Sequence, residues 1–199
     1  QNMTGIVIPG SVKKIGWSAF EGCKRLENLE LPDGLETIVS SAFMGCYGIK
    51  SISVPKTLTN FDPDCFYGIS YLESITVDSE NPRYSSDEFG VLFNKDKTVL
   101  IRYPERCTAV DYTVPDSVVE LETSSFASSW INSVVLPEGL KTIGWNAFEG
   151  CGKLKQIEIP DSVEKIGYHA FFYCVSLEKV EFPESITDIG SWAFYNCEA

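Results

Sequence analysis

The chain has 199 residues, of which 44% are hydrophobic and 13% aromatic, so it holds enough apolar material for a continuous core. Its formal net charge is −12, and an acidic surface of that size repels phosphate backbones and anionic lipid headgroups. No run of residues approaches the roughly 18 apolar positions that cross a bilayer. These properties argue against nucleic acid as a partner and against membrane insertion.

Prolines preceded by alternating apolar residues recur along the chain. They lie 22 or 23 residues apart, with one gap of 60, at Pro9, Pro32, Pro55, Pro115, Pro137, Pro160 and Pro183. Phenylalanines follow the same register, usually within Ala-Phe-x-Gly-Cys, at Phe20, Phe43, Phe66, Phe126, Phe148, Phe171 and Phe194. Two independent markers in one register indicate an internal structural repeat.

Residues 1–77 are predicted to form regular repeats. In the unit 26–46, Leu29 and Leu31 alternate with polar residues just before Pro32, which is typical of a short strand with one buried face. Proline lacks an N–H, so it ends the strand, and the Asp-Gly that follows favours a turn. Phe43 then points back inward. One unit cannot cover its own apolar face, so the units must stack into a solenoid, with most of the repeat phenylalanines in one buried column.

Residues 78–114 form a longer repeat. Residues 90–93 and 98–101 are apolar, and the polar turn 94–97 lies between them, so we expect a β-hairpin inserted into the coil. Regular repeats resume over 115–199. The prediction is a single solenoid domain, 1–199, of about eight coils. Because neither end carries a polar cap, we expect a fragment of a longer protein.

The run Ile157-Glu158-Ile159-Pro160-Asp161-Ser162-Val163, continued by Ile166-Gly167, Ala170-Phe171 and Cys174, resembles the BspA-like class of leucine-rich repeats. The long repeat is similar to that class as well, through Tyr84–Ser86 and Gly90–Asn94. The resemblance implies a right-handed α/β-type leucine-rich-repeat solenoid of short parallel strands, turns and short helical or 3-10 segments. It also implies a bacterial protein that is secreted or attached to the cell surface and that adheres to host or microbial partners.

The cysteines and the histidine, residue types that are often catalytic or metal-binding in other proteins, follow the repeat pattern in this chain. Five of the seven cysteines lie three residues after a repeat phenylalanine, so we expect reduced thiols that act as small core residues. Stacked parallel side chains have the wrong direction for a disulfide. His169, the one histidine, occupies a position held elsewhere by serine, asparagine or tryptophan, which we interpret as an exposed surface position. We therefore predict no enzyme, no catalytic residues, no metal site and no cofactor.

Two surfaces are candidates for a binding site. Outward strand positions form two columns on a concave sheet, and these columns become charged in the last repeats at Glu158, Lys179 and Glu181. The corner before each Ala-Phe pair becomes aromatic in the same repeats at Trp145, Tyr168 and Trp192. Exposed apolar patches often mark contact surfaces. The alternatives are a solvated sheet face and aromatic rings that lie flat over the core.

The leading functional hypothesis is a non-catalytic extracellular or cell-surface binding module for adhesion. Its partner would be a protein of the host matrix or of a microbial surface, because a solenoid presents a large, rigid face. The rival hypothesis is a carbohydrate-binding or accessory segment of a larger secreted protein, because sugars stack on exposed aromatic rings.

Overall fold

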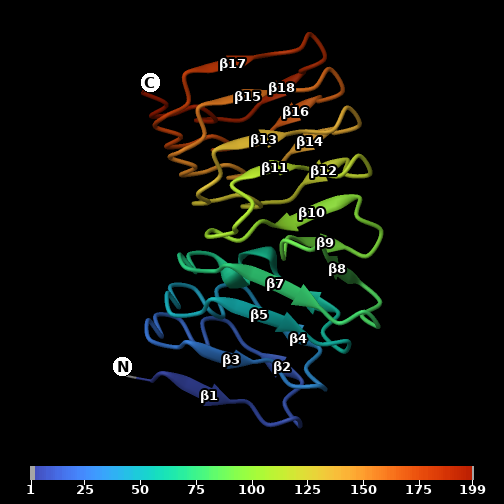
Figure 1. Ribbon diagram of the computed structural model, residues 1–199, viewed down its shortest axis with the longest axis vertical. Coiled ribbons are helices and arrows are strands. Elements are labelled where there is room, and N and C mark those ends of the chain that lie inside the picture. The colour runs from blue at the N-terminus through green and yellow to red at the C-terminus, as the bar shows by residue number, and fades with distance from the viewer. Residues whose placement is uncertain (1–2, 199) are drawn as a thin grey trace.

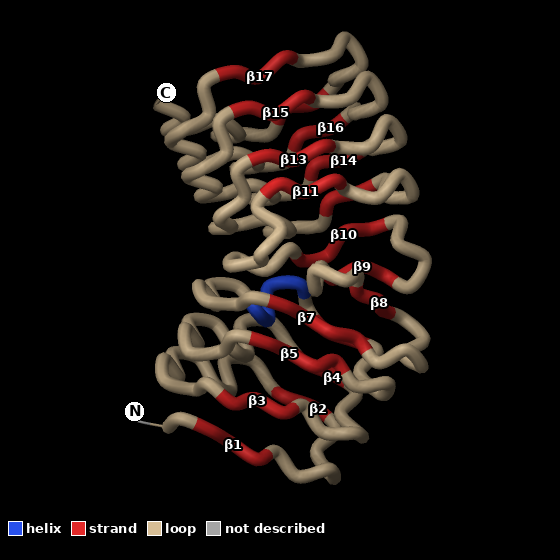
Figure 2. Tube along the Cα trace, in the orientation of Figure 1, coloured by secondary structure: helices blue, strands red, loops and turns tan. Residues whose placement is uncertain are grey.

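A computed structural model describes residues 3–198 of the chain, and its coils stack in one elongated column from the N-terminal to the C-terminal end (Figure 1). Each regular coil contains a first strand, a proline turn, a second strand of two residues and a tight turn segment that holds the repeat phenylalanine. Figure 2 shows that strands and turns make up nearly the whole chain.

The first strands of adjacent coils run side by side and in parallel, except where the long repeat separates the fourth of them from the fifth. They are β1 (Gly5–Val7), β3 (Asn28–Glu30), β5 (Ser51–Val54), β7 (Ser74–Val77), β11 (Asp111–Thr113), β13 (Ser133–Val135), β15 (Gln156–Glu158) and β17 (Lys179–Glu181). The register pairs the same repeat position in adjacent coils, as in Ser51 with Ser74 and Gln156 with Lys179. The middle residue of each strand points inward, so its two neighbours form the outward columns expected from the sequence. We call this outward side the strand face.

The second strands form a separate side of the column. They are β2 (Lys14–Ile15), β4 (Thr37–Ile38), β6 (Asn60–Phe61), β10 (Val99–Arg102), β12 (Glu120–Leu121), β14 (Thr142–Ile143), β16 (Lys165–Ile166) and β18 (Asp188–Ile189). β2, β4 and β6 pair in one sheet, and β10, β12, β14, β16 and β18 belong to a seven-stranded sheet. Each pairs in parallel with the second strand of the next coil along its sheet.

The long repeat adds two antiparallel pairings to this sheet. β8 (Tyr84–Ser86) pairs with β9 (Leu92–Asn94), and β9 pairs with β10 across a turn at residues 95–98. Gly90 enters β9 with φ +77, and a Cβ there would lie 2.5 Å from Ser74 Cβ. Only glycine satisfies both the left-handed backbone and this close approach.

The hydrophobic core has two parts that meet at the long repeat. In β9, Leu92 belongs to the N-terminal core and Phe93 to the C-terminal core, because alternate strand residues face opposite sides. The phenylalanine column is split at the same place. Its two stacks consist of Phe20, Phe43 and Phe66, and of Tyr103, Phe126, Phe148, Phe171 and Phe194.

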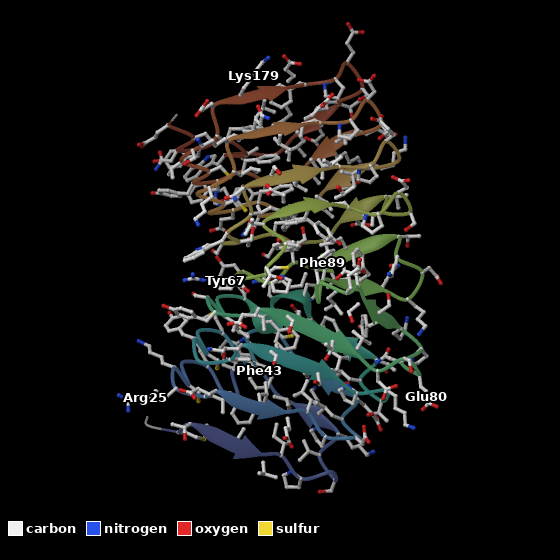
Figure 3. The ribbon with its side chains drawn as sticks, in the orientation of Figure 1. Arg25, Phe43, Tyr67, Glu80, Phe89 and Lys179 are labelled. Atoms are coloured by element: carbon white, nitrogen blue, oxygen red, sulfur yellow. The ribbon has the colours of Figure 1, made fainter. Side chains whose placement is uncertain are left out.

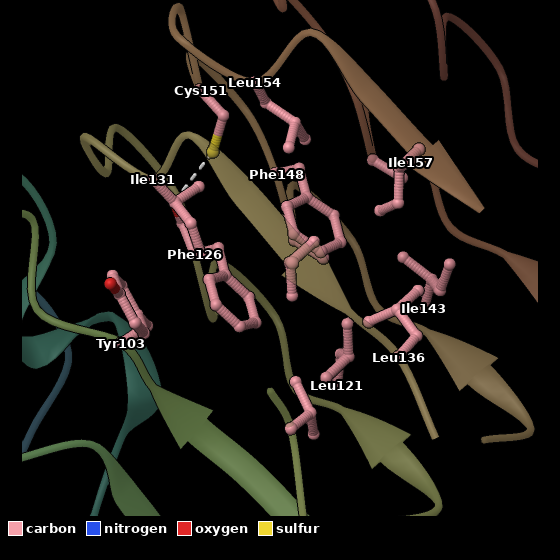
Figure 4. Packing of buried hydrophobic residues seen from close by; sticks show 14 of the residues in the cluster. Tyr103, Leu121, Phe126, Ile131, Leu136, Ile143, Phe148, Cys151, Leu154 and Ile157 are labelled. Carbon is pink, nitrogen blue, oxygen red and sulfur yellow. Dashed lines mark hydrogen bonds between the residues drawn. The ribbon is translucent and has the colours of Figure 1, made fainter. Parts of the chain in front are cut away.

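One continuous column was therefore the wrong prediction. The long repeat has no Ala-Phe turn, and Tyr103 begins the second stack instead. Ring centroids within that stack lie 4.8 to 5.0 Å apart, which matches the spacing between hydrogen-bonded strands (Figure 4).

A buried ion pair lies between the two stacks. Arg102 and Glu105 are both about 2% exposed or less, and the guanidinium Nη2 donates to the Glu105 carboxylate. Arg102 Nη1 also donates to the Ser124 carbonyl at 2.7 Å. This pair was not predicted from the sequence, because Arg102 and Glu105 lie in a segment that has no repeat pattern.

The turn segments are tighter than the expected short helices. Among the described residues, only η1 (Pro63–Phe66) is helical, a 3-10 helix that Asp62 caps by accepting from Asp64 N–H at 3.0 Å. The other coils have a left-handed residue just before Ala-Phe or its equivalent, with φ between 51° and 60°, at Ser18, Ser41, Ser124, Asn146, His169 and Trp192. This backbone interrupts a helix at every corner.

Candidate functional site on the turn segments

We define the turn face by the segments 16–23, 39–46, 62–68, 122–129, 144–151, 167–174 and 190–197. Within residues 16–68 and within residues 122–197, each segment hydrogen-bonds to its neighbour through backbone groups, as Phe148 N–H does to the Ala170 carbonyl at 2.7 Å. This ladder holds the segments at one spacing from coil to coil. Side chains that leave it therefore form rows on the outside of the column.

The last two turn segments carry a cluster of aromatic rings. Tyr168 stacks on His169 with centroids 3.7 Å apart, and Phe172 stacks on His169 at 4.1 Å. Trp192 extends the cluster from the next coil, 5.7 Å from His169. Tyr195 joins it at 5.3 Å from Phe172. We call these residues, together with Tyr173, the aromatic cluster.

The cluster is exposed and does not lie flat over the core. Trp192 is 60% exposed, and Tyr168, Tyr173 and Tyr195 are also exposed. The buried rings of Phe148 and Phe171 lie beneath, in the separate stack described above. Exposure of so many neighbouring rings to water is unfavourable, and exposed apolar patches of this kind often mark contact surfaces.

The structure separates Trp145 from the other two predicted aromatic residues. Trp145 is 65% exposed, and its ring contacts none of the aromatic rings in the part of the chain that the structure describes. Its backbone carbonyl accepts from Ser124 N–H at 2.8 Å, so the residue is fixed but its side chain stands alone.

His169 is half-buried, so the expectation of an exposed imidazole was wrong. Its Nε2 is covered and has no hydrogen-bond partner among the described residues. Serine, asparagine and tryptophan occupy the same position in other coils, and what they share is the left-handed backbone, with φ 57° at His169. Variation of the side chain at this position therefore does not require that the side chain be exposed. The imidazole acts as a flat ring between Tyr168 and Phe172.

A cleft opens on the turn face where the two halves of the solenoid meet. Its volume is about 270 Å³, and it is lined by Ser40, Ser41, Met44, Asp64, Tyr67, Ser124, Asn146 and Glu149. Figure 3 places Tyr67 at mid-height in the column. Tyr67 donates from its hydroxyl to Glu149 at 3.4 Å, across 82 residues of sequence.

Two half-buried carboxyl groups line this junction cleft. Burial raises the pKa of Asp64, and a hydrogen bond from Ser124 partly opposes that shift. Burial also raises the pKa of Glu149, while the nearby His169 and the Tyr67 hydroxyl lower it. This cleft is not predictable from the repeat pattern, because residues from four separate coils meet there only where the long repeat leaves a gap in the turn face.

The thiols on the turn face are core groups. Cys46, Cys151, Cys174 and Cys197 each donate an S–H to the carbonyl of a repeat phenylalanine 25 or 26 residues earlier, at 3.0 to 3.2 Å. Burial raises the pKa of Cys46 to about 11 and that of Cys151 to about 12. These four cysteines form no disulfide, as the sequence predicted. They satisfy turn carbonyls and are poor nucleophiles.

The charged candidates lie together at the C-terminal end of the strand face. Glu158 pairs in register with Glu181, and Lys179 forms an ion pair with Glu181 two residues along the same strand. They line a shallow pocket with Ser133, Val135 and Gln156. Figure 3 shows Lys179 on the last of these strands. Both partners of the ion pair are fully exposed, so solvent screens their attraction.

The described part of the chain shows neither a metal-binding cluster nor a membrane-spanning helix. No group of three or more His, Cys, Asp and Glu side chains within residues 3–198 has the geometry to hold a metal ion. No described helix is long and apolar enough to span a membrane.

Repeated coils with parallel first strands, proline turns and stacked phenylalanines define a leucine-rich-repeat β-solenoid. The model of the BspA type leucine-rich repeat region matches residues 1–110 and 101–199, with six copies. The chain belongs to this family.

Crystal structures of bacterial repeat proteins are similar to this chain. The pneumococcal vaccine antigen PcpA is 31% identical with a TM-score of 0.89, over 95% of this chain and 47% of that chain. A leucine rich cell surface protein from Faecalibacterium prausnitzii A2-165 is 26% identical with a TM-score of 0.79, over 99% of this chain and 58% of that one.

A leucine-rich repeat protein from Eubacterium ventriosum shares the fold at 22% identity and a TM-score of 0.65, over 100% of this chain and 77% of that one. The chain thus spans about half the length of the first two structures, at 47% and 58%. No curated protein matches it significantly.

Proposed function

We propose that this chain is a non-catalytic adhesion module that binds a protein partner outside the cell or on the cell surface, through the aromatic end of its turn face. The observation that carries the proposal is the aromatic cluster, an exposed group of rings on a rigid backbone ladder. The similarity of the chain to a pneumococcal antigen and to a cell-surface protein supports a location outside the cell or on the cell surface.

Energetics favour the turn face over the strand face as the binding site. Aromatic side chains bury a large area while losing few rotamers, and they dominate the free energy of many protein interfaces. Exposed charges such as Glu158, Lys179 and Glu181 contribute little apiece, because solvent screens their attraction. We therefore assign the strand face a secondary role in the association rate.

The state of the polar groups supports binding over catalysis. His169 is held between aromatic rings with its Nε2 covered, and the raised pKa of Cys151 disfavours the thiolate. A nucleophile needs an activating base within hydrogen-bond reach. Cys151 instead donates to the Phe126 carbonyl at 3.1 Å.

A binding assay on immobilised host matrix proteins and mucin tests the proposal. The test variant combines Trp145→Ser with Trp192→Asn, which are residues that Ser40 and Asn146 supply at the same repeat positions, so the backbone tolerates them. We expect binding to weaken at least about tenfold, or about 1.4 kcal/mol, with an unchanged melting temperature.

The matched control carries Glu158→Lys and Glu181→Lys on the strand face. It should alter mainly the association rate and its dependence on salt. If this control abolishes binding while the aromatic variant binds like the parent chain, the strand face is the site and the proposal is wrong.

Carbohydrate binding is the second candidate, and the isolated ring of Trp145 favours it. A single exposed indole, 65% accessible and free of ring contacts among the described residues, suits stacking on a sugar. Glycan-array binding that is lost on Trp145→Ser alone, with protein binding unaffected, would establish this function.

A further inference from the structure

The turn face carries no lysine or arginine. None of the 16 basic residues falls within its seven segments, whereas Glu21, Asp62, Asp64, Glu122 and Glu149 do. The one basic group on it is His169. In this chain, whose net charge is −12, the turn face therefore combines acidic and aromatic side chains and has no lysine or arginine.

Several aromatic rings elsewhere in this chain have one of its own cations over them. The Arg106 guanidinium lies 3.0 Å from the ring centroid of Trp130 and 4.8 Å from that of Tyr71. Lys153 lies 4.3 Å from the Trp130 centroid. No such cation covers a ring of the aromatic cluster within the residues that the structure describes.

The junction cleft and the aromatic cluster include residues of adjacent, hydrogen-bonded turn segments. Asn146 lines the cleft, and its backbone N–H donates to the Tyr168 carbonyl at 2.9 Å. Gly150, next to Glu149, donates to the Phe172 carbonyl at 2.7 Å. One coil thus contributes a carboxylate to the cleft and directly supports the aromatic rings.

The cleft holds an unsatisfied acceptor. Asp64 Oδ1 is covered by protein and has no hydrogen-bond partner among the described residues. Glu149 is partly satisfied by the Tyr67 hydroxyl, whose contacts of 3.4 Å are long. The two carboxylates of the cleft therefore retain acceptor capacity, which favours a ligand that supplies N–H groups.

We propose that the turn face binds a basic segment of the partner protein, with a lysine or arginine side chain between Asp64 and Glu149 and a second cation on the aromatic cluster. An ammonium or guanidinium group in the cleft supplies further donors to Asp64 and Glu149, and the second cation gains attraction from the faces of the exposed rings. This inference rests on the proposed function and names its partner chemistry.

Calorimetric titration of the chain with a short peptide of alternating lysine and glycine tests the inference. The comparison peptide has glutamate in place of each lysine. We expect the basic peptide to bind and the acidic peptide not to bind. Equal binding of both peptides, or no binding of the basic one, overturns the inference.

Isosteric variants locate the contact. Asp64→Asn with Glu149→Gln should weaken binding of the basic peptide at least about tenfold. Glu138→Gln with Asp161→Asn removes the same charge from exposed positions outside the turn face, and it should change the affinity less than about twofold. If both double variants lose affinity equally, the attraction comes from net charge and the cleft is not a site.

Glu149→Lys is a second variant, which reverses the charge at this position and should therefore reduce the affinity more than the isosteric variant does. It should abolish binding of the basic peptide, with melting temperature and circular dichroism showing that the chain remains folded. If this variant binds the basic peptide as the parent does, the assignment of Glu149 is wrong.

Acidification provides an independent measurement on the same groups. Asp62, Glu122 and Arg102 face Asp64, and Tyr67 and His169 face Glu149. Burial places the pKa of each carboxyl above its ordinary value of 3.8 or 4.5. Affinity for the basic peptide should therefore fall as pH is lowered from neutral through these values, because protonation removes the attraction. An affinity that stays constant through this range overturns the inference.

The two proposals fail in different ways. If the basic peptide does not bind but Trp145→Ser with Trp192→Asn still releases the matrix partner, only the partner chemistry is wrong. If that aromatic variant retains the matrix partner, the proposed use of the turn face is wrong.

Discussion

Replacing Phe148 with alanine tests the packing that holds the turn face in place. The ring is fully buried and stacks on Phe126 at 4.8 Å and on Phe171 at 5.0 Å. Burial of such a side chain is worth about 1.5–3 kcal/mol in transfer terms. The cavity left behind and two lost ring pairs bring the expected cost to about 3–5 kcal/mol, because neighbouring coils cannot collapse into the gap.

The matched control is Phe20→Ala, since Phe20 is only half-buried and stacks on a single ring, Phe43, at 5.2 Å. Urea unfolding followed by circular dichroism should give a loss about half as large for this control. The packing argument fails if Phe148→Ala costs less than about 1 kcal/mol, or if the two variants are equally destabilised.

Three further predictions concern the junction and the thiols. Glu105→Ala should destabilise the chain by about 3–5 kcal/mol in urea unfolding, because it leaves the buried Arg102 charge unpaired, and a cost near zero would show that the pair is dispensable. Gly90→Ala should lower the melting temperature, since its Cβ would meet Ser74 at 2.5 Å, and an unchanged value would show that the hairpin entry is misplaced. Cys151 should react with an alkylating reagent only after unfolding, and rapid labelling of the native chain, detected by mass spectrometry, would contradict its burial.

The repeated part of the fold could be predicted because one pattern recurs in every coil. The proline and phenylalanine registers predicted the first strands, the parallel stacking and the inward phenylalanines. The second strands were harder to predict, since two residues such as Thr37 and Ile38 are too few to show an alternation.

The junction could not be predicted because nothing in it repeats. The split core depends on which way Leu92 and Phe93 point, and the buried Arg102–Glu105 pair depends on contacts formed only after stacking. The same holds for the junction cleft, where Tyr67 meets Glu149 across 82 residues.

The candidate aromatic residues were predictable by type and only partly by arrangement. Exposed rings at Tyr168 and Trp192 are indicated by their repeat positions. The stacking of His169 between Tyr168 and Phe172 depends on a left-handed backbone that the sequence does not specify, because serine, asparagine and histidine all occupy that position.

Hydroxyl-radical footprinting of the chain with and without its bound partner tests the central claim most directly, because it reports the exposure of each aromatic side chain. We predict that Tyr168, Trp192 and Tyr195 become protected on binding, while the strand-face residue Val135, also exposed in the unbound chain, stays reactive. Protection of Val135 with unchanged oxidation of the three aromatic residues would place the partner on the strand face and show that the turn face is not the binding site.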